Sequence, residues 1–179
     1  MQILRKTTGI ALSLIGAIGL GIKSADAIHV GVSPPRFEVK IDKKSRSQTI
    51  KIVNLDKKPV MMKAFVRSWT INKDGDMEIV QSTEQTLDQW IVFTPSQFTI
   101  PAGSSQTVRF AIRPKVEPKP GEHRAVLYLQ EVPSQASQTE SSNSVTTVGR
   151  LGIIIYAYAG EIKRVGALNS VNVDAKPNG

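Results

Sequence analysis

The sequence predicts an all-β protein, built as a sandwich or a barrel around one hydrophobic core. Apolar and polar residues alternate with a period of two along much of the chain, and the period of 3.6 residues typical of amphipathic helices is almost absent. Turn signals rich in Gly, Pro, Asn and Asp recur about every eight to twelve residues, the spacing of short antiparallel strands. Around seven strands follow from this pattern.

The chain opens with a predicted export signal. Arg5 and Lys6 precede an apolar stretch from Gly9 to Ile22, and Ala25–Ala27 supplies the small residues of a cleavage site. The stretch has about 14 residues, whereas a membrane-spanning helix needs roughly 20. We therefore expect residues 1–27 to be a cleaved signal peptide, not an uncleaved anchor, and the mature protein to have no stable membrane insertion.

The mature chain is cationic and contains no cysteine. Three positive charges and one negative charge leave with the leader, so the formal net charge falls from +8 to +6. The basic residues are scattered and form no block, which favours a solvated basic surface over nucleic-acid binding. Without cysteine there are no disulfides or thiolate metal sites, so the core alone must stabilise a domain of about 150 residues, which is large enough to do so.

Seven segments carry the strand pattern. In the segment from Gln48 to Leu55, Ile50 and Ile52 share one face. In the segment from Val60 to Trp69, Met62, Ala64 and Val66 share one face. The segments are Gln48–Leu55, Val60–Trp69, Trp90–Phe93, Phe98–Ile100, Gln106–Arg113, His123–Val132 and Val145–Tyr158. Residues 134–144 are polar and predict a surface loop.

No arrangement of residues predicts an enzyme. The acidic segment Asn72–Asp76 invites comparison with a calcium loop, but it lacks the distal Glu and the remaining ligands of an EF-hand, so we expect a hairpin turn. His123 has no metal-binding or catalytic partner nearby in the sequence, and Trp69 and Trp90 are predicted core residues. We expect no metal, cofactor or nucleotide. Thr94–Pro95 is a candidate cis peptide.

Eight segments follow one another in a characteristic order. They are Ser33–Phe37, Asn54–Pro59, Trp90–Pro95, Phe98–Gly103, Gln106–Phe110, Pro120–Ala125, Gln130–Pro133 and Gly149–Tyr156. In this order and spacing they resemble the N-terminal domain of the PapD-like periplasmic pilus-assembly chaperones, and Pro120–Arg124 is similar to the archaic branch. The resemblance covers roughly residues 28–166.

The resemblance implies an immunoglobulin-like, seven-stranded β-sandwich over residues 28–166 and a location in the periplasm. It also implies a binding activity in place of a reaction: chaperones of this family cap incomplete pilin-type subunits by β-strand addition, without ATP. The expected partners are pilin-type subunits and, beyond them, an outer-membrane usher. Residues 167–179 would be a linker and the first strand of a second β-domain, which makes the chain a fragment of a two-domain chaperone.

The resemblance also implies a basic pair that holds the terminal carboxylate of the subunit. Arg36 matches the basic residue of the first strand, and Arg150 is the best candidate for the second basic residue. In the best-known branch the second residue lies two positions later, where this chain has Gly152. Lys163 is the fallback. Paired cations suit a desolvated carboxylate.

The implied donor strand is Val145, Val148, Leu151, Ile153 and Ile155. A spacing of three puts Val145 and Val148 on opposite faces of a strand, and the remaining three alternate as core residues do. This weak donor segment favours an alternative function, a structural or adhesion-type envelope module with the same sandwich. A third alternative is a domain attached to an exported hydrolase.

Overall fold

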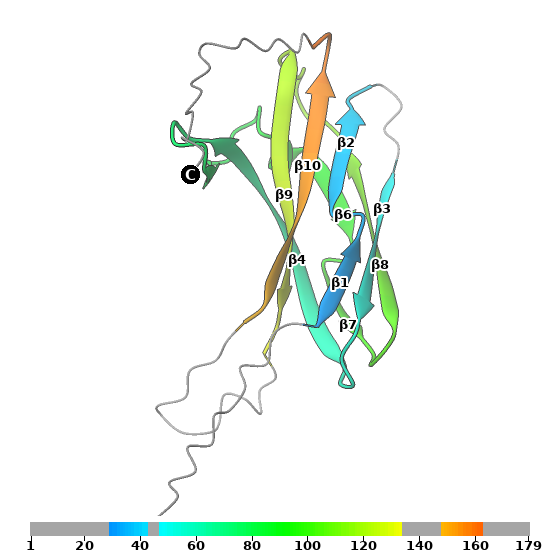
Figure 1. The fold of residues 1–179 in the computed structure, drawn as a ribbon. Coiled ribbons are helices and arrows are strands. Elements are labelled where there is room, and N and C mark those ends of the chain that lie inside the picture. Colours follow the sequence, from blue (N-terminus) through cyan, green and yellow to red (C-terminus); the bar gives the residue numbers. More distant parts are fainter. Residues whose placement is uncertain (1–28, 43–46, 134–147, 163–179) are drawn as a thin grey trace, which may run out of the picture.

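The computed structural model describes residues 29–42, 47–133 and 148–162. These residues form ten strands and one short 3-10 helix, η1 (Leu87–Gln89) (Figure 1). The strands are β1 (Val30–Ser33), β2 (Arg36–Lys40), β3 (Gln48–Asn54), β4 (Val60–Ile71), β5 (Met77–Ile79), β6 (Ile91–Thr94), β7 (Gln97–Ile100), β8 (Ser105–Ile112), β9 (Gly121–Glu131) and β10 (Arg150–Ala159).

The strands build two sheets packed face to face (Figure 1). The smaller sheet has the order β1-β3-β8-β6, and the larger has the order β2-β10-β9-β4-β5, with β7 also pairing with β4. All pairs are antiparallel except β2 with β10, which is parallel. The predicted all-β sandwich is confirmed.

The segment Ser33–Phe37, which resembles the first strand of the family, divides between the two sheets. β1 pairs with β3 in the smaller sheet, and β2 pairs with β10 in the larger. Pro34 and Pro35 separate them, and because proline has no N–H it cannot continue a strand ladder. The Ser33–Pro34 peptide is cis, and so is the predicted candidate Thr94–Pro95. The N-terminal segment therefore ties the two sheets together.

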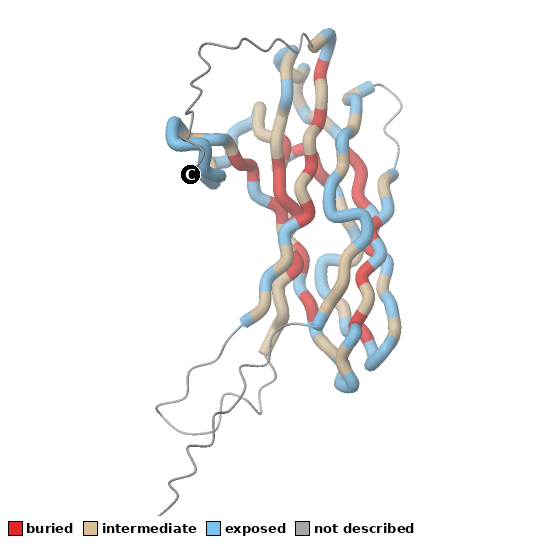
Figure 2. The backbone as a smooth tube through the Cα atoms, viewed as in Figure 1, coloured by how far each residue is buried: buried red, intermediate tan, exposed pale blue. Residues whose placement is uncertain are grey.

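The core lies between the sheets (Figure 2). The predicted inward faces are buried, with Ile50, Ile52 and Met62 fully so. Phe37 of the larger sheet and Phe110 of the smaller meet edge to face, with ring centroids 4.9 Å apart. Trp90 is fully buried, as predicted, and its Nε1–H donates to the Glu84 carbonyl at 2.8 Å.

Each of the seven predicted strand segments differs from the observed strand at one end or at both. Trp90 ends η1 and precedes β6, because its N–H bonds back to the Leu87 carbonyl and closes a helical turn. β4 runs on to Ile71, where it pairs with β5 across the predicted hairpin turn. β10 starts at Arg150 instead of Val145.

Several predicted segments lie outside the described residues. They are the leader over residues 1–27, the polar loop over residues 134–144, Val145, Lys163 and the expected second-domain segment 167–179. In the ranges that the structure describes, no helix is long and apolar enough to cross a membrane.

Asn54 is a fully buried polar residue that joins two turns. Its Nδ2 lies within hydrogen-bond distance of the carbonyl oxygens of Lys58 (2.7 Å), Ile100 (3.1 Å) and Pro101 (3.2 Å). Its Oδ1 accepts the N–H of Asp56 at 2.9 Å. The side chain therefore joins the backbone of the β3–β4 turn to the end of β7 and the residue after it, and its own buried polar atoms have partners.

Candidate functional site

Among the strands that the structure describes, none pairs with the first four residues of β10 on one of its edges, which is therefore called open here. β9 pairs with β10 over its whole length, from Arg150 to Ala159. β2 pairs with it only from Ile154 to Tyr158. No other described strand covers the stretch from Arg150 to Ile153 on the side away from β9. An open strand edge of this kind is a template for pairing with another chain.

Backbone groups of Arg150 and Gly152 point toward this open side. The N–H of Ile154 donates to the Pro35 carbonyl at 3.0 Å, so Ile154 directs its backbone away from β9. Alternate residues of an antiparallel strand direct their N–H and C=O groups to the same side. The N–H and C=O of Gly152 and of Arg150 therefore face the open edge.

The predicted donor residues differ in their accessibility. Ile153 and Ile155 are fully buried in the core, and Leu151 packs partly against it. Val148 is 39% exposed and lies just before β10. The side chains of Ile153 and Ile155 are therefore engaged in the core of the sandwich itself, which leaves Val148 as the accessible apolar side chain of the described part of the donor segment.

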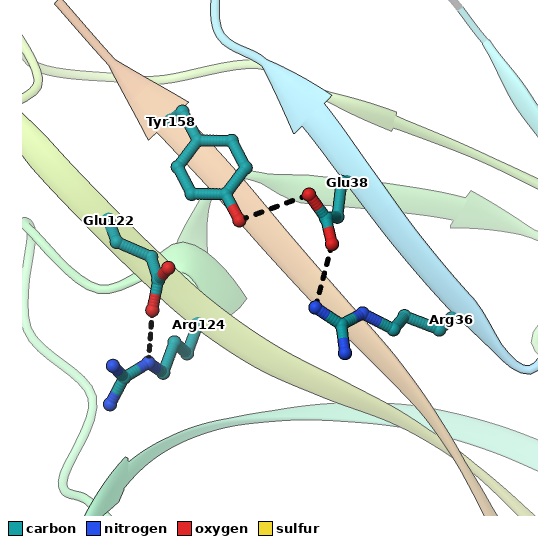
Figure 3. Close-up of polar contacts among 5 residues, drawn as sticks. All are labelled: Arg36, Glu38, Glu122, Arg124 and Tyr158. Atoms are coloured by element: carbon teal, nitrogen blue, oxygen red, sulfur yellow. Dashed lines mark hydrogen bonds and ion pairs between the residues drawn. The ribbon is translucent and has the colours of Figure 1, made fainter. Parts of the chain in front are cut away.

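Arg36 lies at the edge of the larger sheet, where β2 pairs with β10 (Figure 3). Its Nη2 donates to Glu38 Oε1 at 2.7 Å, and its guanidinium carbon lies 4.5 Å from the centroid of the Tyr156 ring. The Tyr158 hydroxyl also donates to Glu38, at 3.4 Å (Figure 3). The Arg36 side chain is 57% exposed, so its charge remains accessible to a ligand.

Arg150 opens β10 and points across β9. Its Nε and Nη2 donate to Gln130 Oε1 at 3.1 and 2.7 Å. Its guanidinium carbon lies 5.4 Å from the ring centroids of both Phe65 and Tyr128. Because Gln130 is neutral, these hydrogen bonds orient the guanidinium without compensating its charge.

The structure does not bring Arg36 and Arg150 together. Arg36 pairs in register with Ile154, four residues after Arg150, which corresponds to about 13 Å along a strand. The guanidinium of Arg36 is held beside Tyr156, farther along β10, whereas that of Arg150 is held over β9 and β4. A joint role in holding one carboxylate stays a prediction.

Gly152 has a packing role on the outer face of the larger sheet. It pairs with Tyr128, and a Cβ atom at this position would lie 3.1 Å from Val126 Cγ2 and 3.5 Å from Tyr128 Cε1. The first of these distances is too short for a comfortable contact. Neighbouring side chains therefore fill the space beside Gly152 on this face.

On the outer face of the larger sheet, Trp69, Tyr156 and Arg124 form a cluster that was not predicted from the sequence. Trp69 is buried, as predicted, but on this face and not between the sheets. Its ring centroid lies 5.7 Å from that of Tyr156 and 5.3 Å from the Arg124 guanidinium carbon. Arg124 in turn pairs with Glu122 (Figure 3). The alternation assigned these residues to one face of each strand, but only the register across strands shows which of them meet.

His123 contacts the buried Trp90 and the turn before β9. The His123 ring lies 4.7 Å from that of Trp90, and its Nε2 lies 2.9 Å from the Lys119 carbonyl oxygen. Among the described residues no group of three His, Cys, Asp or Glu side chains is placed to hold a metal ion.

Asp88 links η1 to β4. Ser68 Oγ donates to Asp88 Oδ1 at 2.8 Å and accepts the Asp88 backbone N–H at 3.1 Å, and the Ser82 hydroxyl donates to Oδ2. Burial raises the pKa of Asp88, but hydrogen bonds from Ser82, Thr86, Ser68 and Gln89 outweigh it, so the pKa lies below its ordinary value.

Several solved structures with a similar fold contain fimbrial or pilus chaperones. A structure described as a chaperone–tip adhesin complex vital for CFA/I fimbriae biogenesis matches with a TM-score of 0.56 and 17% identity, over 74% of this chain and 56% of that one. The SafA pilin–SafB chaperone complex of Salmonella enterica matches with a TM-score of 0.54 and 11% identity, over 79% and 59%.

The CsuC–CsuE complex from archaic chaperone–usher pili of Acinetobacter baumannii matches with a TM-score of 0.50 and 18% identity, over 73% of this chain and 56% of that one. The chain thus spans somewhat more than half the length of the chains that it matches. No curated protein matches the sequence closely enough to count as a relative.

A family model identifies the chain more directly. The model of the pili and flagellar-assembly chaperone, PapD N-terminal domain, matches residues 31–155. This range runs from β1 into β10 and contains both sheets. The chain therefore belongs to the family of PapD-like pilus-assembly chaperones, whose N-terminal domain it contains.

Proposed function

We propose that this protein is a periplasmic chaperone for pilus or fimbrial subunits, and that it caps an incomplete subunit by adding a β-strand to it, without ATP. The observation that carries the proposal is the open edge of β10, where backbone groups of Arg150 and Gly152 face away from β9. A subunit that lacks its last strand presents an unpaired edge of its own, and pairing two such edges satisfies both.

The two arginines give the proposed complex its register. Arg150 begins the open edge, and Arg36 lies beside its far end, opposite Ile154. Either guanidinium offers N–H donors to a carboxylate, and such charge-assisted hydrogen bonds are stronger than neutral ones. We propose that one or both hold the terminal carboxylate of the subunit. An outer-membrane usher is a further proposed partner.

The proposed donor contribution is mainly backbone pairing. Val148 is accessible, whereas Ile153 and Ile155 are engaged in the core. A donor with few accessible apolar side chains gains affinity chiefly from main-chain hydrogen bonds and from the arginines. The alternative, a structural or adhesion-type module, predicts that no subunit binds at this edge.

Co-purification with a pilin-type subunit of the same organism tests the proposal, and position 150 allows a sharp comparison. Arg150→Ala removes the side chain, whereas Arg150→Pro also removes the N–H that faces the open edge. Proline is tolerated at the first residue of a strand. A proline also restricts the backbone conformation of the residue before it, and here that residue is the flexible Gly149.

We expect Arg150→Ala to reduce subunit capture, and Arg150→Pro to reduce it further, while both variants remain folded by circular dichroism. The variant Arg36→Ala/Arg150→Ala measures the contribution of the two side chains together. If folded Arg150→Pro captures the subunit as well as the unchanged protein does, strand addition at this edge is wrong. Failure of the unchanged protein to capture any subunit would favour the structural module.

A further inference from the structure

We propose that the outer face of the larger sheet carries a second binding surface, which takes an extended acidic segment of a protein partner. Its centre is a set of three cations around one ring, here called the Phe65 cluster: Lys63, Arg67 and Arg150. Lys63 Nζ lies 6.0 Å from the Phe65 ring centroid, and the guanidinium carbons of Arg67 and Arg150 lie 5.7 and 5.4 Å from it. Arg150 is shared with the proposed subunit anchor, so the experiment below changes Lys63 and Arg67 and keeps Arg150.

The register of the sheet assembles the cluster from segments far apart in the sequence. Lys63 pairs with Gln130, which pairs with Arg150, so three strands contribute one row. Phe65 pairs with Tyr128 in the next row on this face, and the two rings lie 5.3 Å apart. Arg67 follows on β4, two residues beyond Phe65. The cations thus frame a short aromatic row.

The cluster has no carboxylate partner within the ranges that the structure describes. The two ion pairs found there join Arg36 to Glu38 and Arg124 to Glu122. Arg150 instead donates to the neutral Gln130, and Arg67 to the carbonyl of Val66. The three cations lie 5.4–6.0 Å from one ring centroid. At low ionic strength, where the Debye length is about 30 Å, they repel one another, and a bound anion relieves this repulsion.

The chemistry of the cluster favours carboxylates on an extended chain. A guanidinium that lies against a ring is held in place while its N–H groups stay available for carboxylate oxygens. Arginine beside aromatic rings is also typical of protein–protein interfaces. Lys63 and Arg67 lie along one strand, and an extended segment lying on the sheet would offer carboxylates at every second residue, about 7 Å apart.

The rings of the cluster do not favour insertion into a lipid surface. Phe65 and Tyr128 are half-buried and are covered by the cations that contact them. Peripheral membrane binding relies on apolar side chains that enter the bilayer interface. An anionic membrane is therefore the alternative ligand, and the experiment must distinguish it from an acidic protein segment.

The test uses the full chain and a fluorescent synthetic peptide of alternating Glu and Ser, with an alternating Gln and Ser peptide as its neutral counterpart. The variant Lys63→Gln/Arg67→Gln removes two exposed charges of the cluster and keeps Phe65 and Arg150. Its matched control is Lys51→Gln/Arg109→Gln, which removes two exposed charges from β3 and β8 of the smaller sheet. Fluorescence anisotropy at low and at physiological salt gives the affinities.

We expect the acidic peptide, but not the neutral one, to bind the unchanged protein. We expect Lys63→Gln/Arg67→Gln to weaken binding by about tenfold, as loss of two charge-assisted contacts implies, and the matched control to change it by less than about twofold. Equal weakening by both variants would mean that only net charge matters, and would overturn the proposal.

Two further outcomes also overturn it. One is no binding of the acidic peptide by the unchanged protein at low salt. The other is that the protein sediments with vesicles of phosphatidylglycerol but not with vesicles of phosphatidylcholine, that this binding is lost in Lys63→Gln/Arg67→Gln, and that the acidic peptide does not bind. Neither outcome bears on strand addition, which subunit capture by the Arg150 variants measures separately.

Discussion

Arg36 and Glu38 form an ion pair of 2.7 Å on the outer edge of β2, with both side chains about half exposed. A pair this exposed contributes only about 0–1 kcal/mol to folding. Glu38 therefore accepts hydrogen bonds from the Arg36 guanidinium without stabilising the fold by much. If Arg36 holds the carboxylate of a subunit, that carboxylate must use the same N–H groups. In the proposed function, Glu38 is an internal competitor of the ligand.

The first prediction concerns this competition. We expect Glu38→Gln to strengthen subunit binding by about two- to fivefold, because it removes a competing negative charge from an exposed site. Titration of the purified subunit complex measures the change. In the background of Arg36→Ala the effect of Glu38→Gln should disappear, and an equal gain in that background would show that Arg36 does not hold the carboxylate.

The second prediction separates the donor segment from the core. Ile153 is fully buried, so we expect Ile153→Ala to lower the free energy of unfolding by about 2–5 kcal/mol. Val148 is 39% exposed, so Val148→Ala should change it by less than about 0.5 kcal/mol. Urea unfolding gives both values.

Subunit capture by Val148→Ala then tests whether Val148 takes part in donation. We expect reduced capture by a protein of unchanged stability. Capture equal to that of the unchanged protein would leave backbone pairing and the arginines as the whole of the proposed contact.

The third prediction concerns the buried polar clamp. Asn54→Ala leaves the carbonyl oxygens of Ile100 and Pro101 and the N–H of Asp56 without this partner. We expect a loss of about 2–4 kcal/mol in the free energy of unfolding, from several hydrogen bonds of about 1 kcal/mol each. Asn72→Ala is the control, since Asn72 bonds only the exposed backbone of the β4–β5 turn. A similar loss in both variants would contradict the account.

The fourth prediction concerns acid stability. The pKa of Asp88 is lower in the folded protein than its ordinary value of 3.8, so the charged form stabilises the fold. This stability is fully present above the unfolded-state pKa and is lost as the pH falls through the folded-state value. We expect Asp88→Asn to be less stable than the unchanged protein at pH 6, and the difference to shrink below about pH 4. Thermal unfolding across this range measures it, and a difference independent of pH would contradict the assignment.

Much of the fold follows from local patterns. The inward positions of β3, β4 and β8 were predicted because alternation records which face of a strand meets the core, and Ile50, Met62 and Phe110 are buried accordingly. The turn at Asn72 was predicted from its turn chemistry, and the family from an ordered set of short segments that runs the length of the domain.

Other features could not be read from one segment at a time. The division of the first strand between the sheets depends on pairing partners distant in the sequence, and so does the partial cover of β10 by β2. The contacts of Trp69 also needed the register: alternation along β4 sets its face, but only the pairing of distant strands shows that it meets Tyr156 and Arg124.

The sequence by itself determined the fold class, the family and the residue types at the proposed site, since period, turn chemistry and segment order are local properties of the chain. Only the tertiary structure decided that Arg36 and Arg150 lie apart, that neighbouring side chains occupy the space beside Gly152, and that Lys63, Arg67 and Arg150 surround one ring. The physical reason is register: a strand's own sequence sets which face a side chain takes, whereas the pairing of distant strands sets which side chains meet.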